Sequence, residues 1–143
     1  MTKRPVVLFL CTHNAGRSVA AHALMEHYAA GRVEVRSAGS EPAERLNPAV
    51  VEVLRERGLV PPQATPRGVA DEGAANDVVV TMGCGDSCPF FPATRYVDWP
   101  LRDPSGLPLE EVRPIVDEIE RRVQALLAEL TAPQDARGPC ERP

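Results

Sequence analysis

Hydrophobic residues first gather in one continuous run, Pro5 to Leu10, which stops at Cys11. A short uninterrupted apolar run predicts a strand buried on both faces, as in a parallel sheet, rather than a half-exposed strand. After a polar loop, Ser18 to Ala30 carries apolar residues at helical spacing. Its expected core side is Val19, Ala23, Leu24 and Tyr28, and its expected polar side is His22, Glu26 and His27. The chain is therefore predicted to open as strand, loop and helix.

The remaining pattern alternates strands with helices. We predict a strand at Val33–Ser37, a helix at Pro48–Arg57 closed by Gly58, a strand at Asp77–Met82, a weaker strand at Arg95–Asp98 and a final helix from Leu109 to Leu130, whose first turn is made uncertain by Pro114. Such alternation predicts the α/β class, with a parallel sheet wrapped on both faces and a ligand site beyond the carboxyl ends of the strands.

The pattern also suggests how the chain is divided. Residues 1–131 are expected to form a single domain, and 132–143, rich in proline and charge, a flexible tail. Between the second helix and the third strand, Gln63 to Ala75 is expected to be a long surface loop.

Charge and composition exclude several classes of protein. The net charge of -4 argues against a nucleic-acid or anionic-membrane binder, which normally carries a basic patch. The chain contains no run of 18 apolar residues and no secretory leader pattern, so we expect a soluble cytoplasmic protein. In that reducing compartment, its 4 cysteines are expected to be catalytic, redox-active or metal-binding rather than a disulfide framework.

The most informative segment is Cys11-Thr12-His13-Asn14-Ala15-Gly16-Arg17-Ser18, between the first strand and the first helix. A loop of this length can turn its backbone N–H groups inward, and the helix N-terminus adds partial positive charge. Gly16 is expected to supply a positive φ, and Arg17 offers two parallel donors to a tetrahedral oxyanion. The same field favours a thiolate at Cys11. The alternative is a chance C-x5-R match; the nucleotide-binding P-loop is excluded because its Gly-Lys pair is missing.

Cys11 to Ser18 resembles the signature loop of the low-molecular-weight tyrosine phosphatases and of the arsenate reductases related to them. Ser37-Ala38-Gly39 and Asp103-Pro104-Ser105-Gly106 match further landmarks of that family. The resemblance spans Val6 to about Leu130. It implies a three-layer, doubly wound, four-stranded parallel sheet with strand order 2-1-3-4.

The resemblance also implies roles for individual residues. Cys11 would be the nucleophile, Arg17 the oxyanion ligand, Ser18 a hydroxyl that stabilises the thiolate, and Asp103 the acid that protonates the departing oxygen. The residues support the last role independently, because Asp103 follows the fourth strand and should open on the same sheet edge as Cys11. The alternative for Asp103 is an Asp-Pro turn starter.

Two further cysteines favour reduction over phosphate hydrolysis. Cys84 and Cys88 follow the third strand, which in the 2-1-3-4 order lies about 4.8 Å from the first strand. In the resembling thiol-relay arsenate reductases, a cysteine here attacks the arsenylated nucleophile and another resolves the disulfide. We therefore expect arsenate reduction, and hence arsenical resistance, through Cys11, Cys84 and Cys88, with thioredoxin as reductant or, alternatively, mycothiol with a glutaredoxin-like protein.

Two other functions remain open at this stage. A tyrosine phosphatase would be expected to carry a tyrosine in the Asp-Pro loop, where this chain has Ser105 and Gly106. The other alternative is a non-catalytic, redox-sensitive oxyanion-binding domain, against which the set of Cys11, Arg17 and Asp103 argues.

We expect no cofactor and no metal, and a monomer. No second cysteine or histidine pair accompanies Cys84 and Cys88 at zinc spacing. Some thioredoxin-linked relatives bind potassium through Asn, Ser and acidic residues; Asn14 and Ser37 match, but His22 stands where an acidic ligand is expected. His13 is expected to tune the loop rather than to perform chemistry. Cys140, in the tail, is expected to be incidental.

Overall fold

The structure, a computed structural model, describes residues 4–62, 65–66, 68, 76–83 and 93–131. Its elements follow the order β1 (Val6–Cys11), α1 (Arg17–Ala29), β2 (Glu34–Gly39), α2 (Pro48–Glu56), β3 (Asn76–Thr81), β4 (Ala93–Asp98) and α3 (Leu109–Thr131). All seven predicted elements are present, and their ends differ from the predicted ones by up to two residues, as is usual for helix and strand ends. The predicted division into residues 1–131 and a tail stays a prediction, because residues 132–143 lie outside the described part.

The four strands form one parallel sheet in the order β2-β1-β3-β4, as predicted. β1 is central, so its backbone pairs on both sides, and all six of its residues are buried. Side chains alternate along a strand, so both faces of the sheet are covered. Val7 and Phe9 join the core with the helices, while Leu8 and Leu10, on the opposite face, are also fully buried. Burial of β1 on both faces therefore explains why its apolar run is continuous, as the sequence predicted.

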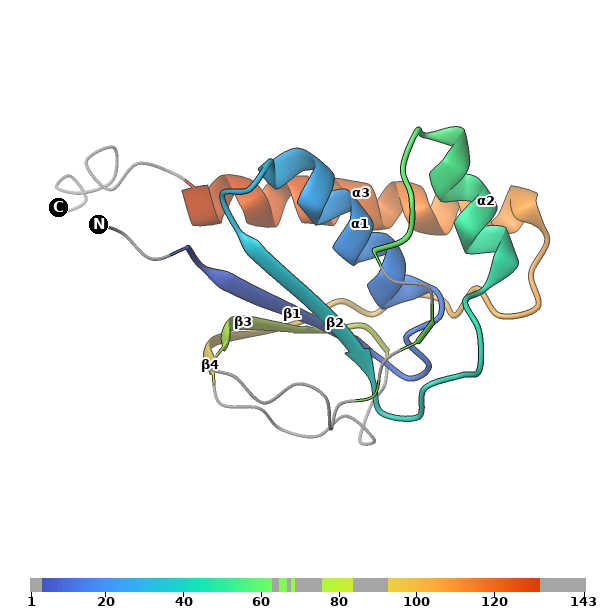
Figure 1. Ribbon diagram of the computed structural model, residues 1–143, viewed down its shortest axis with the longest axis horizontal. Coiled ribbons are helices and arrows are strands. Elements are labelled where there is room, and N and C mark those ends of the chain that lie inside the picture. The colour runs from blue at the N-terminus through green and yellow to red at the C-terminus, as the bar shows by residue number, and fades with distance from the viewer. Residues whose placement is uncertain (1–3, 63–64, 67, 69–75, 84–92, 132–143) are drawn as a thin grey trace, which may run out of the picture.

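In Figure 1 the three described helices lie together on one side of the sheet. α1 packs between β2 and α3, and ten of its thirteen residues are buried. α2 begins with Asn47 as its N-cap: the side-chain oxygen accepts the N–H of Ala49 at 2.8 Å, and Pro48 occupies the first turn, where its missing N–H costs nothing. After α2, Gly58 adopts φ +77°, which ends the helix as predicted.

α3 starts at Leu109 and contains Pro114 within its length. The helix is already established before the proline, because the N–H groups of Glu111 and Val112 both bond to the Pro108 carbonyl. The first turn, which the sequence left uncertain, is therefore helical and lies before the proline.

Ion pairs join the helices at their exposed edges. Arg57, at the end of α2, bonds to Asp117 and Glu120 of α3, and Tyr28 of α1 donates to Glu120. That hydrogen bond raises the pKa of Tyr28 above its ordinary value. These contacts hold α1, α2 and α3 together as one layer. The position of the first residue of α1, Arg17, depends on how this layer is packed.

Candidate active site

The thiol of Cys11 ends β1 and is 2% exposed. The backbone N–H of Asn14 donates to its sulfur at 3.3 Å, and the hydroxyl of Ser18 lies 2.9 Å from the sulfur. The Asn14 side-chain amide donates to the same hydroxyl at 2.7 Å, so the hydroxyl can turn its own hydrogen toward the sulfur when Cys11 is ionised. Hydrogen bonds to the ionised form favour that form, so this arrangement suits a thiolate nucleophile.

The loop that follows Cys11 directs its carbonyl groups outward. Four of them accept backbone N–H groups from the segment that connects β2 to α2: Cys11 from Ser40 at 3.2 Å, Thr12 from Glu41 at 2.7 Å, His13 from Ala43 at 3.0 Å and Ala15 from Asn47 at 2.8 Å. In a trans peptide unit the N–H points opposite to the C=O. The N–H groups therefore turn toward the inside of the loop, which is the arrangement that binds an anion.

Gly39 allows the strand to approach the loop this closely. A Cβ atom on Gly39 would lie 2.7 Å from both the Asn14 nitrogen and the Thr12 oxygen, and both of these are backbone atoms that cannot swing away. Gly39 also pairs with Cys11 in the β1–β2 register. This contact gives a steric reason for the Ser37-Ala38-Gly39 landmark.

The predicted role of Gly16 is wrong in its details. Gly16 has φ −135°, whereas Asn14 carries the positive φ, 48°. Asparagine tolerates this left-handed region better than most residues. Gly16 is needed for a different reason, since a Cβ there would lie 2.8 Å from the Cγ of Pro104.

Arg17, the first residue of α1, is 6% exposed and turns its guanidinium into the site. One of its nitrogens donates to the Leu101 carbonyl at 3.1 Å, and the other lies 3.8 Å from a carboxylate oxygen of Asp103. The first turn of α1 holds no acidic residue, so neither the helix dipole nor the guanidinium is neutralised from within the helix. Both remain available to an oxyanion.

Asp103 lines the same cavity as Cys11, and its side chain is 48% exposed. Its second carboxylate oxygen accepts the Ser105 N–H at 3.0 Å, which is the Asp-Pro turn considered as the alternative reading. The turn and the position beside Arg17 are compatible, because different oxygens serve them. Asp103 lines the same cavity as Cys11, and its role as a proton donor stays a prediction.

A cavity of about 450 Å³ lies beside these residues. Its lining includes Cys11, Arg17 and Asp103, together with His13, Ala15, Gly16 and residues 43, 45–49 and 104–107. Of the predicted oxyanion-binding residues, Thr12 and Asn14 do not line it; Asn14 is buried and acts on the sulfur and on Ser18. The His13 ring is fixed by Nδ1, which must donate to the Glu41 carbonyl at 3.0 Å. Its tuning role stays a prediction.

Cys84, Cys88 and Cys140 lie outside the described residues, but the strand that leads to the first two is described. β3 lies beside β1, and the Met82 N–H donates to the Leu10 carbonyl at 2.7 Å. Gly83, the residue before Cys84, has φ +90°, and a Cβ on it would lie 2.2 Å from an Arg17 nitrogen. The backbone therefore runs against the guanidinium just before Cys84.

His22 does not belong to a polar surface as predicted: it is 5% exposed, because α1 is packed between β2 and α3. Its Nδ1 lies 2.8 Å from the Ser37 hydroxyl. The Ser37 hydroxyl is thus hydrogen-bonded to a ring nitrogen. The expected absence of a potassium site stays a prediction. Among the described residues, no group of three His, Cys, Asp or Glu side chains could hold a metal ion.

None of the helices in the described part of the chain is long and apolar enough to cross a bilayer.

Three known proteins are similar to this chain. A solved thioredoxin-dependent arsenate reductase from Corynebacterium glutamicum is 43% identical, with a TM-score of 0.73; the match covers 90% of this chain and 62% of that longer chain. A solved arsenate reductase from Archaeoglobus fulgidus is 36% identical, with a TM-score of 0.74, over 85% of this chain and 98% of that one. A curated glutaredoxin arsenate reductase from Synechocystis is 31% identical over 87% of this chain and 98% of its own length.

The family is settled by a match along most of the chain. The family model described as low molecular weight phosphotyrosine protein phosphatase matches residues 6–136, and this range includes all of the described site residues. The chain belongs to the low molecular weight phosphotyrosine protein phosphatase family.

Proposed function

We propose that this protein is a cytoplasmic arsenate reductase that uses Cys11 as nucleophile and passes the resulting oxidation to Cys84 and Cys88. The observation that carries the proposal is a buried thiol at the base of an anion-binding loop. The thiol accepts the Asn14 N–H, lies 2.9 Å from the Ser18 hydroxyl and shares its cavity with Arg17 and Asp103. Free thiols that cycle in this way require a reducing compartment. The arsenate reductases among its relatives support the choice of substrate.

In the first step, the Cys11 thiolate attacks arsenic, and an As–O bond breaks. Inward N–H groups and Arg17 hold the tetrahedral anion, and their hydrogen bonds strengthen as charge shifts onto its oxygens. Asp103 gives a proton to the leaving oxygen, which departs as water. The product is an arsenylated Cys11, in which arsenic is still in its +5 state.

In the second step, the Cys84 thiolate attacks the sulfur of Cys11. An S–S bond forms, the S–As bond breaks, and the bonding pair stays on arsenic, which leaves as arsenite in the +3 state. Cys88 then attacks Cys84, forming a Cys84–Cys88 disulfide and freeing the Cys11 thiolate. A redoxin dithiol returns the two electrons. The backbone path at Gly83 supports the first exchange, because it brings the chain to Arg17 immediately before Cys84.

Thioredoxin is the proposed reductant. A disulfide within the chain is a substrate that a redoxin dithiol can reduce directly, and the C. glutamicum relative is thioredoxin-dependent. The Synechocystis relative is a glutaredoxin arsenate reductase, so glutaredoxin, with mycothiol or another small thiol, is the competing reductant.

Hydrolysis of aryl phosphates is the competing reaction for the same family. Among the residues that the structure describes, those lining the cavity include no Phe, Tyr or Trp to stack on an aryl group, and Pro104 is followed by Ser105 and Gly106. This composition favours a small inorganic anion over a phosphotyrosine side chain.

The deciding experiment is arsenate reduction with thioredoxin, thioredoxin reductase and NADPH, followed by peptide mapping after one turnover. We expect a Cys84–Cys88 linkage in the wild type. Cys88→Ser should release one arsenite per protein and stall as a Cys11–Cys84 disulfide, whereas Cys84→Ser should release none. Cys140→Ser is the matched control and should turn over like the wild type. Sustained turnover of Cys88→Ser with thioredoxin would exclude the relay.

A further inference from the structure

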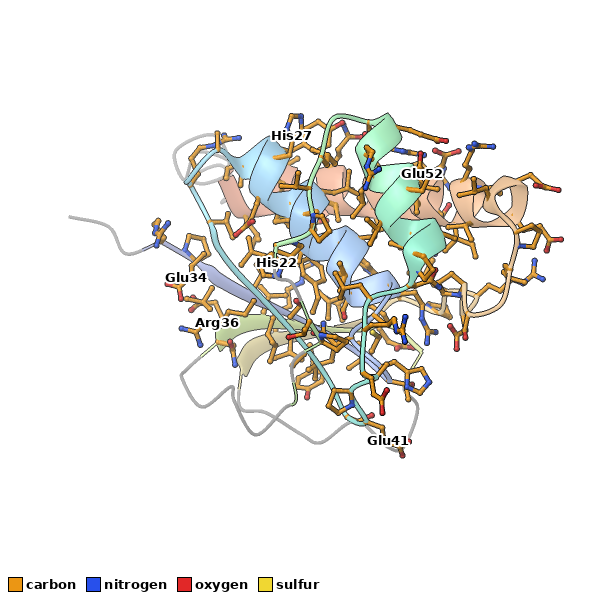
Figure 2. All side chains as sticks on the ribbon, turned by 45° about the vertical axis from the view of Figure 1, so that its right-hand side comes forward. His22, His27, Glu34, Arg36, Glu41 and Glu52 are labelled. Carbon is orange, nitrogen blue, oxygen red and sulfur yellow. The ribbon has the colours of Figure 1, made fainter. Side chains whose placement is uncertain are left out.

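A buried imidazole lies outside the catalytic cavity, on the helix that carries the active-site arginine. His22 of α1 is 5% exposed and does not line the cavity. It lies between α1 and β2, where Figure 2 labels it. Burial of a polar ring is unfavourable unless its nitrogens are paired. Nδ1 lies 2.8 Å from the Ser37 hydroxyl, and Nε2 lies 3.2 Å from a Glu26 carboxylate oxygen.

The direction of these hydrogen bonds follows from the partners. A carboxylate can only accept, so Nε2 of His22 carries the proton and donates to Glu26. In the neutral ring, Nδ1 is then an acceptor and the Ser37 hydroxyl donates to it. Both ring nitrogens are satisfied in one orientation, which fixes the ring between an exposed carboxylate and a buried strand hydroxyl.

The position of His22 connects it to the nucleophile. Ser18 and His22 are four residues apart on α1 and lie on the same helix face. The Ser18 hydroxyl is 2.9 Å from the Cys11 sulfur. On the other side, Ser37 lies two residues before Gly39, which packs against the backbone of Thr12 and Asn14. The His22–Ser37 hydrogen bond thus fastens the helix face that bears Ser18 to the strand that supports the loop.

We propose that His22 is a positioning residue for the Cys11 thiolate. Its bond to Ser37 fixes the position of α1 against β2, and thereby holds the Ser18 hydroxyl at hydrogen-bond distance from the sulfur. The proposal rests on the proposed function only in that it takes Cys11 as the nucleophile. It does not depend on arsenate, on Cys84 or on the identity of the reductant.

Two substitutions separate the two hydrogen bonds of the ring. Asparagine places its amide near the position of Nδ1, so His22→Asn can keep the bond to Ser37. Glutamine places its amide near the position of Nε2, so His22→Gln can keep only the bond to Glu26. Ser37→Ala removes the strand partner and leaves the ring intact. His27→Gln, an exposed histidine on the same helix, is the matched control.

The test measures the reactivity of Cys11 rather than turnover. In a full-length chain with Cys84, Cys88 and Cys140 replaced by serine, iodoacetamide alkylates Cys11 as the sole thiol, and the rate constant is followed against pH. We expect His22→Gln and Ser37→Ala to move the midpoint of this curve upward and to slow alkylation at neutral pH by about tenfold, the effect of weakening one hydrogen bond to a charged group. His22→Asn should stay within about threefold of the parent and His27→Gln should match it.

The proposal is overturned if Ser37→Ala keeps the parental midpoint, or if His22→Asn is slowed as much as His22→Gln. Should His22→Gln fail to fold, as thermal melting would show, Ser37→Ala decides the question alone. A protein with the expected alkylation pattern that does not reduce arsenate would refute the proposed function and leave the role of His22 standing.

Discussion

The two sides of the active site are built differently. On the side of the proposed nucleophile (the nucleophile side, Cys11 to Arg17), four carbonyl groups are bonded to the segment between β2 and α2, and Gly39 packs against the backbone without space for a methyl group. On the side of the proposed acid (the acid side, residues 101–107), Asp103 is about half-exposed, and a Cβ on Gly106 would meet no atom of the described residues within 4 Å. The nucleophile side is therefore preorganised before any anion arrives, whereas the acid side has room to adjust to what is bound.

From this contrast we expect the two sides to perform different tasks. Recognition of a tetrahedral anion requires donors that are already in place, because ordering them at the moment of reaction would cost part of the stabilisation they provide. Delivery of a proton needs only an approach within hydrogen-bond distance at the right time. Each of the following substitutions tests whether the two sides differ in this way.

The largest effect is expected from a methyl group at the closest contact on the nucleophile side. Gly39→Ala should lose most arsenate reduction and about 3 kcal/mol of unfolding free energy, because the Cβ would overlap backbone atoms that cannot move independently. Gly106→Ala, on the acid side, should cost about 1 kcal/mol, from its φ of +76° alone. Urea unfolding measures both values. Equal losses would show that the two sides are equally rigid.

The next largest effect concerns the guanidinium. Arg17→Lys should lower kcat/KM for arsenate by about 100-fold, since an ammonium cannot bond to the Leu101 carbonyl and also offer two parallel donors to the anion. Arg55→Lys, at an exposed position of α2 outside the cavity, is the control and should be neutral. A loss smaller than about threefold in Arg17→Lys, under about 0.7 kcal/mol, would contradict this role.

A smaller effect is expected on the acid side. Asp103→Asn should reduce kcat by about tenfold, because the amide can still accept the Ser105 N–H but cannot supply a proton, and water has access to the exposed position. Comparison with Asp103→Ala separates the two roles in steady-state assays. Similar losses in the two variants would assign the effect to the proton, and a much larger loss in Asp103→Ala would assign it to the turn.

The sheet order was predicted only by the family resemblance. Local pattern was enough to predict the elements and the loop that begins at Cys11. The buried run before it and the helical spacing after it are properties of neighbouring residues. The expectation for Gly16 failed because its requirement comes from Pro104, a contact between distant parts of the chain. The backbone could obtain its positive φ from Asn14 instead, since asparagine adopts that region readily.

Two other features had no usable signal in the sequence. The outward carbonyl groups of the loop are held by backbone N–H groups, which every residue except proline possesses. These are the N–H groups of Ser40, Glu41, Ala43 and Asn47. His22 was assigned to a polar face because amphipathic spacing assumes that one side of a helix meets water, and α1 has protein on nearly all sides. Its burial could be learned only from the packing. The pairing of Cys84 with Cys88 stays a prediction.

The outward carbonyl groups also connect anion binding with the stability of the whole fold. The inward N–H groups exist as a set only while the segment between β2 and α2 is docked on the loop, so an unfolded chain cannot bind the anion in the same way. Any ligand that binds only the folded state stabilises it in proportion to the logarithm of its concentration, by about 2.7 kcal/mol at a hundredfold excess over its Kd. Phosphate, which shares the shape and charge of arsenate, would act through the same site. In a cell, phosphate that competes with arsenate for this site would therefore also stabilise the folded enzyme when arsenate is absent.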